Sequence, residues 1–414
     1  MASAPNVAQA FSPLDEELQL LPGRLSPTLH EGLVRLSSWM PFAPAARLLA
    51  DFMHLPEIPE SLARRYTETA GAAYVQVQTE RVTQIERQAP LETEAPERLV
   101  LEADGAMVPL VGGKWAEAKT LILGTVGEPL TVDGEVHWPV RALSSFSRLC
   151  DNKQFERLSL VETQRRGLER AAQVAAIADG AEWIQGWIDY HRPDALRILD
   201  FAHATEYLSK LGASVHGEQT PALQQWLAEP CRRLKAEGGQ RLLTDLHAWS
   251  DGQPQSDVRR EALAYLDKRL PQLAYAEFRA QGWPIGSGAV ESANKLVVEA
   301  RLKGSGMHWA AAHVDPMLAL RNVVCSDRWD EAWPQVAQRL RHAPRQRHLK
   351  TQARPPGPTA TPIASQSPPT PLPLATVATA STPSAQRPAS DHPWRKFRFG
   401  RALYQPASVA KPKS

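Results

Sequence analysis

The chain has 414 residues, enough for two or three domains with a sizeable core. It carries 47 Lys and Arg against 45 Asp and Glu, a formal net charge of +2, so any nucleic-acid-binding surface must be local. Its three cysteines, Cys150, Cys231 and Cys325, form no closely spaced pair, which argues against a disulfide framework and a structural zinc site. No apolar run of about 18 residues occurs, and the start lacks a signal-peptide pattern. We therefore expect a cytoplasmic protein with no membrane partner.

Residues 1–95 are expected to form a helical region. Residues 1 to about 24 read as an extended arm, and Ser26-Pro27 signals the start of a first helix with apolar positions at helical spacing up to Trp39. A second helix is predicted over 45–53, and a longer third helix from about Glu60. Such helices suit either plain packing or a helix-turn-helix. In the second case the DNA contacts would be Ser61, Arg64, Arg65 and Thr67.

The pattern changes to β structure near residue 96. Two β-rich runs, 99–110 and 115–126, flank Gly112-Gly113 and predict a hairpin. Asp133-Gly134 is a second hairpin signal, with a further strand over 136–140. A helical segment of mixed charge then spans about 152–170.

Two apolar strands follow, each ending in an aspartate and leading into a helix. The first ends at Asp179 and the second, 196–199, ends at Asp200. This alternation predicts a parallel part of the sheet, where ligands gather beyond the carboxyl ends of the strands. Residues from about 205 to 281 contain no strand signal and read as a helical insertion.

The most distinctive stretch runs from Gly282 to Trp309. Its glycines and Pro284 predict a turn that can pass close to a ligand, and 290–302 reads as a helix with Glu291 in its first turn. The helix dipole favours a carboxylate there, which is also what a surface helix cap would use. Further helices are expected up to about 340, and the Pro-rich residues 346–414 read as a disordered tail. Its basic, aromatic stretch 394–399 suits either nucleic-acid contact or a solvated tail.

Three carboxylates from separate elements have the chemistry of a phosphodiester-cleaving site. Asp104 lies on the first strand, Asp179 at the end of a central strand and Glu291 on the late helix. Hard oxygen ligands of this kind hold two divalent cations about 3.5 to 4 Å apart on either side of a scissile phosphate. Each residue also has a structural reading, since Asp104-Gly105 and Asp179-Gly180 suit ordinary turns.

Several motifs together resemble the insertion-sequence DDE transposases of the Kra type (ISKra family). They are Asp104-Gly-x-Met-Val-Pro with Trp115-x-Glu117-x-Lys119, Asp179-Gly-Ala-x-Trp-Ile, and Gly286-Ser-Gly-x-Val-Glu291 followed by Arg301, Lys303, Gly306, Met307 and Trp309. The resemblance covers about residues 15 to 345. It implies an α/β fold: an RNase H-like mixed sheet with a helical insertion, an N-terminal helical region and a disordered C-terminal tail. The catalytic domain would span 96–345, preceded by the DNA-end-binding region.

The resemblance also implies an activity and a site. Asp104, Asp179 and Glu291 would bind two Mg²⁺ ions, with Mn²⁺ as a substitute. The enzyme would cut double-stranded DNA at the element's ends and join the freed 3′ hydroxyl to target DNA. It would act as a homo-oligomer on DNA in the bacterial cytoplasm, associated with the nucleoid.

Other residues near this site have assignments of their own. Asp200 and His203 resemble an Asp-x-x-His signature of related transposases and are expected close to the site; Asp200 also rivals Asp179 as second carboxylate. A partly buried, structural His203 is the alternative. Arg301, Lys303 and His308 are candidate phosphate contacts, whereas Trp309, Trp183 and Trp187 are expected in the core.

Two functions from other classes remain open. One is a catalytically silent DNA-binding protein of transposase origin. The other is a metal-dependent hydrolase of a different substrate, with Asp200 and His203 binding the metal directly. The second would favour softer ions such as Zn²⁺, whereas oxygen ligands alone favour Mg²⁺ or Mn²⁺.

Overall fold

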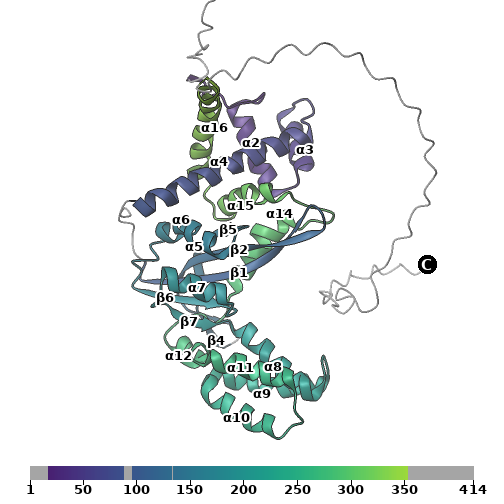
Figure 1. The fold of residues 1–414 in the computed structure, drawn as a ribbon, viewed down its shortest axis with the longest axis vertical. Helices are drawn as coiled ribbons and strands as arrows, with labels where there is room; N and C mark the ends of the chain where they lie inside the picture. The colour runs from purple at the N-terminus through teal and green to yellow at the C-terminus, as the bar shows by residue number, and fades with distance from the viewer. Residues whose placement is uncertain (1–16, 88–95, 133, 353–414) are drawn as a thin grey trace, which may run out of the picture. The chain divides into compact units, whose positions relative to one another are not determined.

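A five-stranded mixed sheet with helices on both faces forms the centre of the structure, a computed structural model that describes residues 17–87, 96–132 and 134–352 (Figure 1). The predictions for residues 1–16, for Asp133 and for the tail beyond Gln352 lie outside the described residues. The predicted α/β class, with N-terminal helices ahead of the sheet, is confirmed.

The N-terminal helices follow the proline signals of the sequence. Helix α2 (Pro27–Trp39) starts where predicted, and the Ser26 hydroxyl accepts a hydrogen bond from the Leu29 amide at 3.4 Å. Helix α3 (Phe42–Met53) starts earlier than predicted, because Pro44 fits in the first turn, where an amide hydrogen is not needed. Helix α4 (Glu60–Arg87) is the long third helix.

The sheet has the strand order β5-β2-β1-β6-β7. Strand β1 pairs antiparallel with β2, which pairs antiparallel with β5, while β6 is parallel to β1 and β7 is parallel to β6. The predicted hairpin at Gly112-Gly113 and the predicted parallel strands are therefore confirmed. The strands are β1 (Arg98–Leu110), β2 (Lys114–Val126), β5 (Val140–Arg148), β6 (Gln173–Ala178) and β7 (Leu196–Leu199).

The prediction of one strand over 136–140 is wrong. A small hairpin of β3 (Leu130–Val132) and β4 (Glu135–His137) ends at His137, and Val140 begins the separate strand β5. Pro139 lies between them and has no amide hydrogen to continue a ladder. Most of β5 escaped prediction because its inward positions include Ser145 and Ser147, which are buried although polar.

Helices and short connections make up the remainder of the described residues. No strand occurs between residues 201 and 280, as expected for the predicted insertion. The last described helix extends to Gln352, past residue 346, where the tail was predicted to begin. The helices are α5 (Asn152–Leu158), α6 (Leu160–Arg165), α7 (Glu182–His191), α8 (Phe201–His216), α9 (Pro221–Glu237), α10 (Gly239–Asp251), α11 (Asp257–Lys268), η1 (Leu270–Leu273), α12 (Tyr275–Ala280), α13 (Gly288–Ala293), the π-helical η2 (Asn294–Glu299), α14 (Ala300–Leu302), α15 (Ala311–Cys325) and α16 (Trp329–Gln352).

The two faces of the sheet bury different sets of helices. Leu99, Leu101 and Ala103 of β1 point to the face that packs against α5 and α7. The alternate residues point to the other face, which carries two separate clusters. Val100 belongs to a cluster with α8, α10, α11 and α12, whereas Ala106 and Val108 belong to a cluster with the N-terminal helices, α15 and α16.

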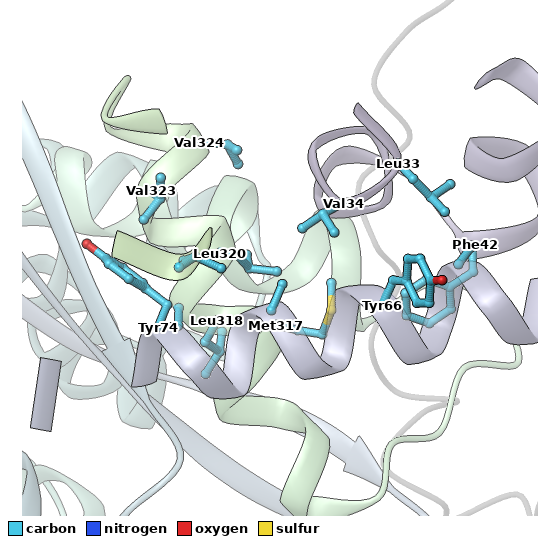
Figure 2. Close-up of a cluster of buried hydrophobic side chains, with 14 of the residues drawn as sticks. Leu33, Val34, Phe42, Tyr66, Tyr74, Met317, Leu318, Leu320, Val323 and Val324 are labelled. Atoms are coloured by element: carbon cyan, nitrogen blue, oxygen red, sulfur yellow. The ribbon is translucent and has the colours of Figure 1, made fainter. Parts of the chain in front are cut away.

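The cluster that contains Ala106 and Val108 joins the two ends of the described chain. Figure 2 shows Val34 of α2 and Tyr66 of α4 in one core with Met317 and Leu320 of α15. All four side chains are nearly inaccessible to solvent. The N-terminal helices therefore share a core with helices that follow the Gly282–Trp309 stretch.

Candidate acidic site at the carboxyl ends of the central strands

Glu102 and Asp104 lie between the two clusters on one face of β1. Residues two apart on a strand point the same way, so both carboxylates follow Val100 and precede Ala106 on this face. The apolar sequence of the face is thus interrupted by two acids. Side chains of this kind in an otherwise apolar face need polar partners or a ligand.

The register of the parallel strands brings the predicted aspartates to one edge of the sheet. Glu102 pairs with Ile177, and Ile177 pairs with Ile198. Two residues further along each strand direction there is an aspartate. These are Asp104 on β1, Asp179 directly after β6 and Asp200 directly after β7. The three aspartates therefore lie at the carboxyl ends of adjacent strands, as expected for a ligand site in an α/β sheet.

Asp104 is half-buried and close to other acids. Its carboxylate accepts hydrogen bonds from the Gly105 amide at 2.7 Å and from Asn294 Nδ2 at 2.9 Å. Burial raises the pKa of Asp104, and the negative charge of Asp179 raises it further despite these hydrogen bonds. Two carboxylates that repel each other in this way favour a cation between them.

Asp179 sits in a tight turn between β6 and α7. Its Oδ1 accepts a hydrogen bond from the Ala181 amide at 2.8 Å, just before α7 begins. Gly180 has φ +80°, which other residues rarely adopt. A hydrogen bond from the backbone of the turn therefore orients the Asp179 side chain.

The helical stretch that carries Glu291 is attached to β1 by two contacts. The Val290 amide donates to Glu102 Oε2 at 2.7 Å, and Asn294 contacts Asp104. Glu102 is 1% exposed, and burial raises its pKa to about 7. After α13 the stretch becomes π-helical, a form often found at functional sites.

Glu291 itself does not join the two aspartates in this structure. Its side chain is 67% exposed and pairs with Lys295 Nζ at 2.5 Å. Asn294, three residues later and hence on the neighbouring part of the same helix face, occupies the position beside Asp104. Among the described residues, no three His, Cys, Asp or Glu side chains come close enough to hold a metal ion.

Asp200 has a structural role at the start of α8. Its Oδ2 accepts a hydrogen bond from the His203 amide at 3.1 Å, and its Oδ1 accepts one from the Ser287 amide at 2.9 Å. Asp200 thus caps α8 and ties it to the glycine-rich turn before Glu291. Both oxygens of Asp200 thus serve as structural acceptors that connect α8 with this turn.

His203 lies in a group of aromatic side chains. Its ring packs edge-on against Tyr207 and Tyr265, and Nδ1 lies 3.5 Å from Glu206 Oε2. The contact between Asp200 and His203 is made through the His203 backbone. The two side chains therefore form no metal pair in this structure.

Arg301 is buried in this structure, which argues against the predicted contact with DNA phosphates. The side chain is 1% exposed, its Nε donates to the Ser37 carbonyl at 2.9 Å, and its guanidinium carbon lies 4.5 Å from the Phe42 ring centroid. Burial lowers its pKa to about 10. Trp309 packs nearby at 7% exposure, which confirms the core prediction for that residue.

The other predicted DNA contacts are more accessible. Arg64, Arg65 and His308 are exposed, and Lys303 is partly exposed and pairs with Glu299 at 2.7 Å. Thr67 is buried, and its hydroxyl donates to the Ala63 carbonyl at 2.7 Å, so it cannot serve as a recognition residue here. The accessible basic groups lie at the start of α4 and after α14.

Sequence reasoning overlooked Glu102 and Asn294. A signal for each was available, because Glu102 precedes Asp104 by two residues on a strand and Asn294 follows Glu291 by three on a helix.

No protein-family model matches the chain, and a search of curated proteins finds no match either. Among the described residues, no helix is long and apolar enough to cross a bilayer.

Proposed function

We propose that this chain is a DDE transposase, which cleaves DNA at the ends of an insertion sequence and transfers the strands to target DNA. The observation that carries the proposal is the joint placement of Asp104, Asp179 and the Glu291 helix. One carboxylate lies on β1 and the other directly after the parallel strand β6, and the helical stretch contacts the first of them through Asn294. The strand order β5-β2-β1-β6-β7, with three antiparallel strands followed by two parallel ones, supports the RNase H-like fold in this proposal.

The donor atoms present fit Mg²⁺, or Mn²⁺ in its place. Asp104 and Asp179 supply carboxylate oxygens, and the Asn294 Oδ1 atom beside them is buried without a hydrogen-bond partner. Oxygen ligands of this type are the ones these hard cations prefer. Asp104 and Asp179 would hold the metal. Glu291 would join them only after its ion pair with Lys295 opens.

Divalent cations in such a site supply Lewis-acid activation of the nucleophile and stabilisation of the leaving oxygen. The chain's own groups keep the carboxylates in place. Asn294 orients Asp104 through a hydrogen bond, and Glu102 holds the first turn of the Glu291 helix through the Val290 amide. The exposed Arg64 and Arg65 on α4 would contact the DNA backbone.

The experiment is cleavage of a labelled duplex that carries the element's own ends, with Mg²⁺ present. We expect wild type to cut, and Asp104→Asn, Asp179→Asn and Glu291→Gln to bind the duplex without cutting. Asp200→Asn is the matched control, because asparagine also caps helices well and should leave cleavage largely intact.

Other outcomes would support a rival function. Wild type that binds the ends without cutting indicates a silent DNA-binding protein. Wild type that neither binds nor cuts, yet hydrolyses another phosphoester or amide with Zn²⁺, indicates the hydrolase. Loss of cleavage in Asp200→Asn but not in Asp179→Asn would transfer the second carboxylate to Asp200.

A further inference from the structure

The helical stretch 201–280 contacts the turn that carries Asp179. Tyr265, near the end of α11, donates its hydroxyl hydrogen to the Asp179 carbonyl. Arg269, one turn later, donates from Nη2 to the Gly180 carbonyl at 2.7 Å. Two side chains from a distant part of the chain thus hold consecutive carbonyl groups of this turn.

Gly180 makes these contacts possible. A β-carbon at this position would lie 2.3 Å from Arg269 Nε and 2.8 Å from the Tyr265 hydroxyl oxygen. Both distances are shorter than a carbon atom can tolerate, and φ at Gly180 is +80°. The positive φ favours glycine beside Asp179, and a β-carbon there would displace the Arg269 and Tyr265 side chains from the turn.

Tyr265 is itself held in a stacked column. Its ring lies parallel to the Tyr207 ring of α8, with centroids 3.6 Å apart and an angle of 3° between the planes. The Arg269 guanidinium carbon lies 3.6 Å from the Tyr265 ring centroid, and Lys210 Nζ lies 4.1 Å from the Tyr207 centroid. Cations on both outer faces stabilise such a column. The Tyr265 hydroxyl is therefore fixed in position.

The chemistry of the Tyr265 hydroxyl suits a donor to the turn. A tyrosine hydroxyl has one hydrogen to donate, and the Asp179 carbonyl accepts it. A guanidinium has donors and no acceptor, so Arg269 also contacts the turn as a donor only. Both side chains thus act as donors to carbonyl groups of the turn.

We propose that Tyr265 and Arg269 are positioning residues, through which the helical insertion holds the Asp179 carboxylate beside Asp104. This inference rests on the proposed function, since it assigns the insertion a role at the same metal site. Neither residue is required to touch DNA or metal. The stack and the two hydrogen bonds fix the turn, and the turn directs the carboxylate.

The test compares Tyr265→Phe with Tyr207→Phe in the full-length protein. Each variant removes one hydroxyl from the same ring pair and keeps the stack. Of these two tyrosines, only Tyr265 has a hydroxyl that hydrogen-bonds within the described part of the chain, and its acceptor is the Asp179 carbonyl. Comparing the two variants therefore separates the effect of losing the hydrogen bond from Tyr265 to Asp179 from any effect on the packing of the two rings.

Two readouts are used, and neither depends on DNA cleavage. The first is hydrogen exchange of the amides in residues 177–186 without metal. The second is the affinity for Mn²⁺ alone, measured by electron paramagnetic resonance. We expect Tyr265→Phe to speed exchange in this segment and to weaken Mn²⁺ binding by about two- to tenfold, the usual effect of one neutral hydrogen bond. Tyr207→Phe should match wild type in both.

The inference is overturned if Tyr265→Phe matches wild type in both readouts, or if the two variants change alike. Arg269→Gln provides a second arm and should also speed exchange in the segment 177–186. Failure of the proposed function looks different: wild type would cut no DNA, while exchange would still respond to Tyr265→Phe. Failure of the inference alone would leave wild-type cleavage intact and exchange unaffected by the variant.

Discussion

Replacing Glu102 with glutamine should change how the stability of the protein depends on pH. Glu102 is 1% exposed, its Oε2 accepts the Val290 amide hydrogen, and its Oε1 has no hydrogen-bond partner. Burial raises its pKa from 4.5 to about 7, with a smaller contribution from the charge of Asp200. Glutamine has nearly the same shape and can accept the same hydrogen bond, but it does not ionise.

The sign follows from the raised pKa. The folded protein holds the Glu102 proton more tightly than the unfolded chain does. The contribution of this proton to the free energy of unfolding is therefore complete below pH 4.5 and is lost as the pH rises through 7. The interval between the two pKa values corresponds to about 3 kcal/mol at pH 8, at roughly 1.36 kcal/mol per pH unit. Because glutamine does not ionise, the Glu102→Gln variant does not lose this part of its unfolding free energy as the pH rises.

The assay is urea unfolding of wild type and Glu102→Gln at pH 5, 6, 7 and 8. The quantity of interest is the difference in unfolding free energy between the two proteins. His30 and His191, whose pKa values burial lowers to about 4, titrate in both proteins and cancel in that difference. Between pH 5 and 8 the difference should shift by about 2 to 3 kcal/mol in favour of the variant.

Glu182→Gln is the matched control, because the Glu182 side chain is 90% exposed. It loses the same charge at the surface and should follow the wild-type dependence on pH. A difference between wild type and Glu102→Gln that stays constant from pH 5 to 8 would show that burial does not raise the pKa of Glu102. The role of Glu102 at the Glu291 helix would then have to be explained without its charge.

Three further predictions concern the site and its surroundings. Asp200→Ala should lower the unfolding free energy by about 1 to 2 kcal/mol, and Asp200→Asn by much less, because asparagine still caps α8; equal losses in urea unfolding would contradict the cap. Gly180→Ala should cost about 1 to 3 kcal/mol and abolish cleavage, because of the positive φ and the contact with Arg269; wild-type cleavage would exclude the proposed turn geometry. Lys303→Ala should reduce the salt dependence of DNA binding by about one phosphate contact. Arg301→Ala should leave that dependence unchanged and lower the unfolding free energy, because Arg301 is buried. Anisotropy titrations over a range of salt concentrations measure this dependence, and they would show the reverse if Arg301 contacts DNA.

The parts of the fold that could be predicted are those with local signals. The strands that end at Asp179 and Asp200 were predictable because short apolar runs lead into polar residues and helix starts. Gly112 and Gly113 predicted the β1–β2 hairpin, since both adopt positive φ. Strand β5 was not predictable in this way, because Ser145 and Ser147 are buried through contacts with Ser326 and Thr120.

The candidate site was predictable only in part. The order and element types of Asp104, Asp179 and Glu291 follow from the sequence, but the pairing of Glu291 with Lys295 in place of the aspartates does not. The burial of Arg301 depends on Ser37 and Phe42, which lie more than 250 residues away in the sequence. Tyr265 reaches Asp179 across 86 residues, and no local pattern indicates that contact.

In the proposed transposase, Asp179 would bind the metal used for DNA cleavage. The most direct test of this role is substitution by cysteine, because a thiolate binds Mg²⁺ poorly and the softer Mn²⁺ better. Asp179→Cys should fail to cut the element's ends with Mg²⁺ and should regain cleavage with Mn²⁺, while Asp200→Cys should show no such metal-specific recovery. Absence of recovery in Asp179→Cys, or recovery in Asp200→Cys alone, would contradict the account.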